Sequence, residues 1–144
     1  MIQRIHDLLR NCECFAFETT LSGRRNLPLI QSAQGASYVV NLIYIWLSTP
    51  DLALSRVADR VRQGGHHVAE EVIRRRYDRG LLNFFRLYRP LADTWTLCDN
   101  SDRELRIVAQ GTKTDQTVFD EGRFGRIENA ASEAKRRLGS AMDR

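Results

Sequence analysis

The sequence predicts a single α/β domain in which helices flank a parallel sheet. Segments whose apolar residues recur at helical spacing alternate with short apolar runs, an order typical of strand and helix units around such a sheet. The run from Tyr38 to Leu47 is apolar almost throughout, as expected of a strand covered on both faces. The chain has 144 residues, of which 42% are hydrophobic and 28% charged, so we expect residues 1–144 to form one domain with one core.

Two helices and two strands are expected in the first third of the chain. Helical spacing of apolar residues predicts a helix over Ile2–Arg10, and a second helix is expected over Asn26–Gln34, ended by Gly35. Strands are predicted over Cys14–Thr20, which is apolar and aromatic at first, and over Tyr38–Leu47.

A pair of helices separated by glycines is expected in the middle of the chain. Thr49 can cap the first helix, and Gly64 and Gly65 stop it. The second helix starts near Ala69 and is expected to end at Pro90, because proline cannot continue a helix.

The last third of the chain is predicted to add two short strands and a terminal helix. The strands are expected over Trp95–Cys98 and Leu105–Ala109, and the helix over Glu128–Leu138. The segment from Gly111 to Gly125 is polar and weakly patterned, so we expect a loop there.

The charge balance favours a ligand that carries phosphate. Lys and Arg total 22 against 18 Asp and Glu, giving a net charge of +4, and nearly all of the positive charge is arginine. The planar guanidinium group binds oxyanions bidentately, which suits a nucleotide or nucleic acid. A generally basic surface explains the same composition equally well.

The cysteines and the apolar runs argue against a secreted or membrane protein. Cys12, Cys14 and Cys98 lack the spacing of a zinc site or a disulfide framework, which fits the reducing cytoplasm. The run from Tyr38 to Leu47 is too short to span a bilayer, which takes about 20 residues. The first residues contain no apolar signal region.

One candidate site lies at the end of the first predicted strand. Ligands of open α/β sheets bind beyond the carboxyl ends of the strands, which here are followed by Glu18–Arg24. A carboxylate at this place can position magnesium or a substrate in phosphoryl transfer. Without further context, a glutamate at the end of a strand such as Glu18 is more often simply solvated.

A second candidate is the helical hairpin around the two glycines. Arg56 and Arg60 lie one turn apart on its first arm, and Arg76 and Arg79 lie one turn apart on the second. Arginines on such a lid can close over a phosphoryl group and stabilise its charge. An ordinary hairpin with a solvated charged face is equally consistent with the spacing.

The histidines and cysteines are weaker candidates. His66 and His67 are adjacent, so their side chains point apart, and no third metal ligand lies nearby in the sequence. They can contact a phosphate or remain exposed. Cys12 and Cys98 would act as nucleophiles only beside a base, and the sequence nominates none.

Taken together, these segments resemble a known family. The string FETTLSGR, then STPDLALSRVADRVRQGGHHVAEEVIRRRYDRGLLNFF and finally DNS are similar to the zeta toxin family of P-loop kinases, over about Phe15–Ser101. Residues 102–144 would form a C-terminal extension. The resemblance implies a kinase fold with a helical lid that uses ATP and Mg²⁺. The studied zeta toxins phosphorylate UDP-N-acetylglucosamine, and an antitoxin restrains them.

The resemblance also assigns roles to individual residues. It implies a small-molecule substrate, such as a sugar nucleotide, and an antitoxin as protein partner. The catalytic candidates are Glu18, Arg60 and Arg76, the substrate-binding candidates are Thr20 and Arg24, and the nucleotide-binding candidates are His66, Arg79, Asp99 and Asn100.

The chain departs from the family in one large respect. No G-x-x-x-x-G-K-[ST] loop occurs anywhere in the sequence, and the upstream strand with a catalytic aspartate is also absent. We therefore interpret the chain as an N-terminally truncated kinase domain that is inactive and binds no cofactor by itself. A start codon placed too late, a frameshift or a degenerate gene would explain it. The missing first strand should leave apolar residues uncovered, among them Phe15, Phe17, Ile43 and Ile45.

The alternative is a non-catalytic binding module. Such a module would pair with a separate protein or bind nucleic acid through its arginines, with nucleic acid the less favoured partner. No membrane partner is expected.

Overall fold

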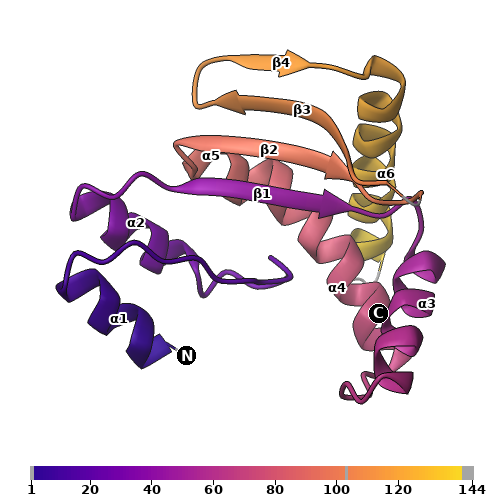
Figure 1. Ribbon diagram of the computed structural model, residues 1–144. Coiled ribbons are helices and arrows are strands. Elements are labelled where there is room, and N and C mark those ends of the chain that lie inside the picture. The colour runs from indigo at the N-terminus through magenta and orange to yellow at the C-terminus, as the bar shows by residue number, and fades with distance from the viewer. Residues whose placement is uncertain (1, 103, 141–144) are drawn as a thin grey trace.

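The computed structural model describes residues 2–102 and 104–140, which form a mixed α/β structure (Figure 1). Its helices and strands run in the order α1 (Ile2–Arg10), α2 (Leu27–Gly35), β1 (Asn41–Trp46), α3 (Pro50–Arg62), α4 (Glu70–Asn83), the π-helix η1 (Phe84–Tyr88), α5 (Arg89–Leu91), β2 (Thr94–Asp99), β3 (Arg106–Thr112), β4 (Gln116–Val118) and α6 (Glu121–Ser140).

The sheet is mixed, which corrects the expectation of a parallel one. Its four strands lie in the order β1-β2-β3-β4. Strand β1 is parallel to β2, as a connection through helices allows, whereas β2–β3 and β3–β4 are antiparallel. The short connections between the last three strands leave no room for a crossover helix, so these strands must alternate in direction.

One face of the sheet is covered by helices and holds the core. Helices α4 and α6 lie along this face in Figure 1. Tyr44 of β1 stacks on Phe84 with ring centroids 4.6 Å apart, and Phe84 also meets the edge of Trp95 of β2 at 6.2 Å. Leu97 and Ile127 are fully buried in the same cluster. The core therefore joins the sheet to both long helices.

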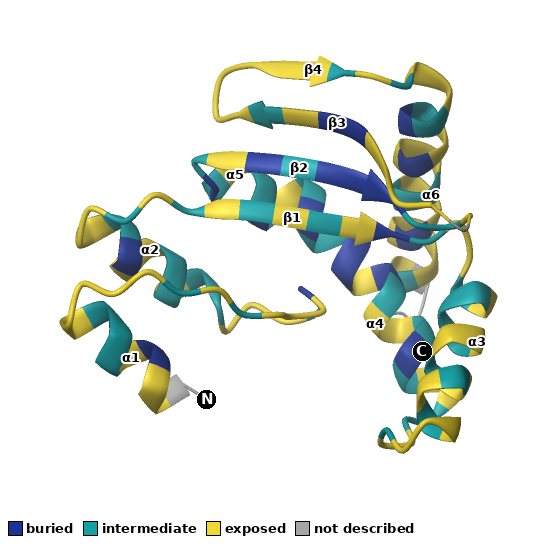
Figure 2. Ribbon diagram, in the orientation of Figure 1, coloured by how far each residue is buried: buried dark blue, intermediate teal, exposed yellow. Residues whose placement is uncertain are grey.

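The opposite face of the sheet keeps apolar side chains exposed. Ile43 is 66% exposed and Ile45 is 51% exposed, as expected for a sheet that lacks cover on this side. Ile45 pairs with Cys98, and Cys98 pairs with Ile107, which is 53% exposed, so these three side chains form a row on one face. Figure 2 shows the resulting alternation of exposed and less exposed residues along β1.

The predicted hairpin of helices is confirmed, with the expected signals at its turn. The Thr49 hydroxyl accepts a hydrogen bond of 3.1 Å from the Leu52 N–H and so caps α3. Gly64 has a φ of +94°, and the Gly65 N–H donates to the Arg60 carbonyl at 2.9 Å. A left-handed glycine ends the helix because other residues adopt this conformation at a cost.

The second long helix continues one residue beyond Pro90. Helix α4 passes into η1 and then into α5, which ends at Leu91. The wider π turn comes directly before Pro90, where the Arg89 N–H donates to the Phe84 carbonyl. The expected end of the helix was thus correct to within one residue.

Three other sequence predictions were wrong. Residues Cys14–Thr20 belong to no strand, because no described segment lies beside them as a hydrogen-bonding partner. The expected loop from Gly111 to Gly125 contains β4, and α6 begins at Glu121 rather than at Glu128. Pairing with β3 makes a strand of a polar segment whose own pattern is weak.

No helix within residues 2–102 and 104–140 is long and apolar enough to cross a membrane.

Candidate functional site

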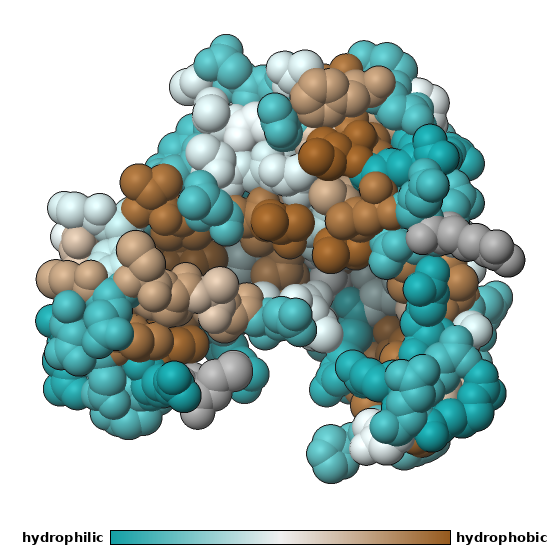
Figure 3. Space-filling view, in the orientation of Figure 1, coloured by the Kyte–Doolittle hydropathy of each residue, from teal (hydrophilic) through white to brown (hydrophobic). Residues whose placement is uncertain are grey.

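A large groove lies between the first 40 residues and the open edge of β1. Its volume is about 980 Å³. Figure 3 shows apolar side chains above the notch that separates the N-terminal helices from α3. One wall is the extended segment from Phe15 to Leu21, the other is β1 with the residues before it, and α3, α4 and Tyr88 contribute further lining residues.

Four of the predicted site residues line this groove. Glu18 and Thr20 reach it from the extended segment, Arg60 from the end of α3 and Arg76 from α4. All four are exposed, so each can meet a ligand from solution. The fold thus brings together residues that are up to 58 positions apart (76 − 18) in the chain. Their chemical roles remain predictions.

The other predicted residues do not line the groove. Arg24, His66 and Arg79 are exposed elsewhere on the surface. Asn100 lies beyond β2, where its N–H donates to the Trp46 carbonyl at 2.9 Å and its own carbonyl accepts from Arg56 at 3.4 Å. The backbone of Asn100 therefore connects β1, β2 and α3.

Asp99 is held in a buried ion pair. Its carboxylate accepts a 2.5 Å hydrogen bond from Arg123 and further bonds from Ser101. Burial by itself would raise the pKa of Asp99, but the hydrogen bonds from Ser101 and Arg123 outweigh it, so the pKa is lowered. With its side chain only 1% exposed, Asp99 joins β2 to α6, and its role as a nucleotide-binding residue stays a prediction.

Residues missed by the sequence analysis hold the segment that carries Thr20. Gly80 of α4 lies directly against it, since a Cβ at this position would lie 2.5 Å from the Thr20 carbonyl oxygen. The Asn83 amide donates to the Leu21 carbonyl at 2.8 Å, and the Tyr88 hydroxyl donates to the Gly23 carbonyl at 2.6 Å. We call these contacts the Gly80 clamp. A glycine inside a predicted helix was the one signal that could have identified it.

Leu21 forms the sharp bend at the end of the extended segment. It has a φ of +53°, in the left-handed region that costs a leucine about 1–2 kcal/mol. Its side chain is only 4% exposed and belongs to the core cluster. Burial of this side chain compensates for the strained backbone and fixes the direction of the preceding segment.

A second set of contacts holds the other end of the groove. The Gln34 amide at the end of α2 donates to the Leu91 carbonyl at 2.9 Å and to the Asp93 carboxylate at 3.1 Å. The same carboxylate accepts from the Val40 N–H at 2.9 Å and from Lys113 at 2.6 Å. These bonds, led by the one from Lys113, lower the pKa of Asp93 to about 2. We call them the Asp93 clamp.

Two tyrosines among the residues that line the groove are held in apolar surroundings. Burial raises the pKa of Tyr44 and also raises that of Tyr77, to about 12. The Tyr77 hydroxyl donates to the Leu47 carbonyl at 2.7 Å, directly after β1. Both tyrosines therefore stay neutral over the physiological range.

The groove offers few ligands for a metal ion. The described residues contain no cluster of three or more His, Cys, Asp or Glu that could hold one. Glu18 is the one acidic residue among the described residues that line the groove, and Thr20 lies two positions after it in the chain. One carboxylate suits Mg²⁺ only when a phosphate supplies further ligands.

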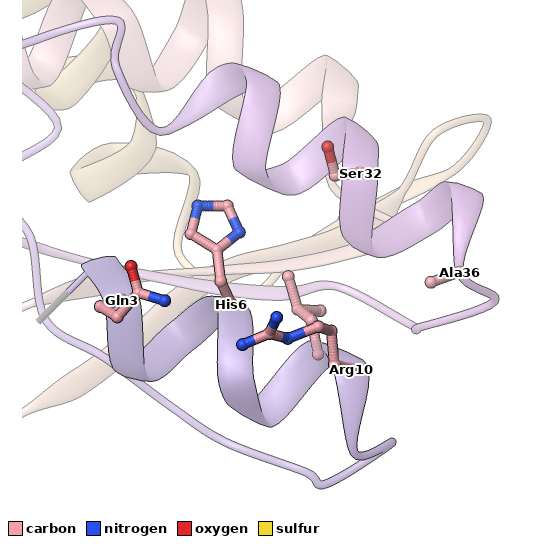
Figure 4. A pocket seen from close by; sticks show the side chains of 6 residues that line it. Gln3, His6, Arg10, Ser32 and Ala36 are labelled. Carbon is pink, nitrogen blue, oxygen red and sulfur yellow. The ribbon is translucent and has the colours of Figure 1, made fainter.

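A smaller hollow of about 500 Å³ lies between α1 and α2. In Figure 4 His6 and Gln3 extend from α1, and Ser32 lies on α2. None of the predicted site residues lines it, and the described residues of its lining include no acidic group. We therefore interpret this hollow as a gap in the packing of α1 against α2 and not as a candidate site.

The fold and groove define an α/β protein with an open, mixed sheet and a largely apolar groove at the sheet edge. No protein-family model and no solved structure matches the chain. A protein of Haemophilus influenzae described as uncharacterized is 35% identical over 63 residues. This match covers 44% of the chain and 45% of the relative, less than half of either.

Proposed function

We propose that the groove is the arginine-bearing half of a phosphotransferase site of the zeta toxin type, within a P-loop kinase-like domain. The observation that supports the proposal is that Glu18, Thr20, Arg60 and Arg76 line one groove although they come from three separate segments. The order of the motifs in the sequence and their meeting at one groove are both expected of such a site.

The chemistry available to these residues is positioning and charge stabilisation. Arg60 and Arg76 can hold the oxygens of a phosphate or diphosphate, and guanidinium groups do so through bidentate bonds. Glu18 can orient a sugar hydroxyl or a magnesium ion, and the Thr20 hydroxyl can donate to a phosphate oxygen. These interactions bind and orient a substrate before transfer.

The groove residues suit a phosphate or diphosphate better than they suit the triphosphate of ATP. A triphosphate is usually held by a glycine-rich run of N–H groups with a lysine, and these 144 residues contain no such motif. We therefore derive no transfer step, and we expect no micromolar binding of magnesium-ATP by this chain. Calorimetry that detects such binding would show that another phosphate cradle exists.

The proposal is tested by titrating UDP-N-acetylglucosamine and following amide chemical shifts by NMR. Arg76→Ala should weaken binding by at least about tenfold, because a charge-assisted hydrogen bond contributes roughly 1.5–3 kcal/mol. Arg75→Ala is the matched control, since Arg75 directly precedes Arg76 in α4 and is absent from the residues that line the groove. Equal effects of the two variants, or shifts confined to residues outside the groove, would contradict the proposal.

A second candidate function is a non-catalytic interaction module. The groove is mostly apolar, with Glu18, Arg60 and Arg76 as its only charged lining residues among those described. An apolar groove with few polar groups suits a polypeptide better than a sugar nucleotide. This candidate predicts a protein ligand and no response to the nucleotide.

A further inference from the structure

The open edge of β1 presents unpaired peptide groups. The Val40 carbonyl accepts from the N–H groups of Asp93 and Thr94, and the Trp46 carbonyl accepts from Asn100, so residues 40 and 46 face β2. Successive residues of a strand direct their peptide groups to opposite edges. The N–H and C=O groups of Asn41, Ile43 and Ile45 must therefore point away from β2, toward the groove.

The opposite wall of the groove is unpaired as well. Within the described part of the chain, no backbone group of residues 14–20 has a hydrogen-bond partner. Phe15 stacks beside Phe17 with ring centroids 6.5 Å apart, as residues two apart on one side of an extended chain do, so we infer that the chain is extended at these residues. Phe15 also packs against Tyr38 at 6.1 Å.

Two unpaired extended backbones thus line one groove, and we propose that the groove binds a β-strand of a separate polypeptide. The inserted strand would pair with β1 on one side and with residues 14–20 on the other, which joins both walls into one sheet. The inference does not depend on the proposed phosphotransferase function, because the strand pairing rests on the backbone and the arginines bear only on which residue ends the inserted strand.

The groove also defines the chemistry of that strand. Apolar residues such as Phe17, Val39 and Ile45 line most of it, so the strand should be apolar over about five residues, the usual length of a short strand. At the carboxyl end of β1 the lining changes to Leu47, Arg60 and Arg76. An acidic residue should therefore lie at the end of the strand that reaches these arginines.

The probe for the test is a capped peptide, acetyl-Lys-Val-Val-Ile-Val-Thr-Glu-amide, added to the whole chain. Hydrogen exchange followed by NMR should slow about tenfold at the amides of Ile43 and Ile45, because each gains a hydrogen bond. The amides of Leu42 and Tyr44 already face β2 and should change much less. The same peptide with alternate N-methylated residues keeps its side chains and loses donors on one edge, so it should bind much more weakly.

A variant of the chain separates strand pairing from simple apolar contact. Proline is tolerated on an edge strand where the missing N–H faces solvent, so Ile43→Pro should fold and lose most of the protection given by the peptide. Slowing at Leu42 and Tyr44 instead, equal binding of the methylated peptide, or no slowing at millimolar peptide would overturn the proposal. Protection of Ile43 that rises with protein concentration alone would also overturn it, in favour of a second copy.

Discussion

Replacing Gly80 by alanine tests how the wall of the groove is held in place. The new Cβ would lie 2.5 Å from the Thr20 carbonyl oxygen and 3.6 Å from the Tyr44 hydroxyl. The first distance is far below van der Waals contact and involves backbone, so the segment must move away from α4. We expect this movement to break the Asn83 bond to Leu21 and to expose the Leu21 side chain.

The expected net effect on the free energy of unfolding follows from opposing contributions. Alanine is favoured over glycine inside a helix by about 1 kcal/mol. Loss of the Asn83 hydrogen bond costs about 1 kcal/mol, and exposing a buried leucine costs about 2 kcal/mol. The variant should therefore be less stable by about 2 kcal/mol, which lowers the Tm by roughly 6 °C for a chain of this size.

Gly125→Ala provides the matched control, because no atom of the described residues lies within 4 Å of the Cβ position at this glycine in α6. It should raise the stability by up to about 1 kcal/mol through helix propensity alone. The measurement is urea unfolding followed by circular dichroism, with NMR shifts of Thr20 and Leu21 as a local report. If both glycine variants are stabilised equally, Thr20 does not pack against α4 and the assignment of the Gly80 clamp is wrong.

Three further outcomes can be checked with simple variants. Because folding lowers the pKa of Asp93 from 3.8 to about 2, its contribution to stability is complete above about pH 4 and is lost as the pH falls through 2; Asp93→Asn should flatten this loss in acid unfolding curves. Tyr77→Phe removes the bond to Leu47 and should cost about 1 kcal/mol in urea unfolding, and an unchanged midpoint would contradict that bond. Ile43→Thr combined with Ile45→Thr keeps β-branched residues on the uncovered face of the sheet but makes them more polar. The double variant should show less self-association in light scattering at equal stability. Unchanged association would show that this face of the sheet does not mediate it.

Local patterns in the sequence predicted most of the secondary structure. The hairpin of α3 and α4 was clear from Thr49, the two glycines and the helical spacing, because these signals act within a few residues. Strands β1 and β2 were clear from their apolar runs. By contrast, β4 is polar and exists because β3 lies beside it, which no local pattern can show.

The candidate site was predictable only in part, for a similar reason. The sequence nominated Glu18, Thr20, Arg60 and Arg76, and these residues do line one groove. It did not show that Asp99 is bound by Arg123, since the two lie on different elements and meet only through the packing of α6. The sequence analysis did not identify the Gly80 clamp, because glycine and asparagine occur in many helices without a special role.

The two clamps have a consequence for the entropy lost when an occupant binds the groove. The Gly80 clamp fixes one end of the extended segment, and the Asp93 clamp fixes the start of β1 beside α2. The segment around Phe15 and Phe17 forms the wall opposite β1, and within the described part of the chain its backbone has no hydrogen-bond partner. The clamps position both walls when the chain folds. Most of the conformational entropy of the groove is therefore lost on folding and not on binding, and the main entropy loss on binding is that of the occupant.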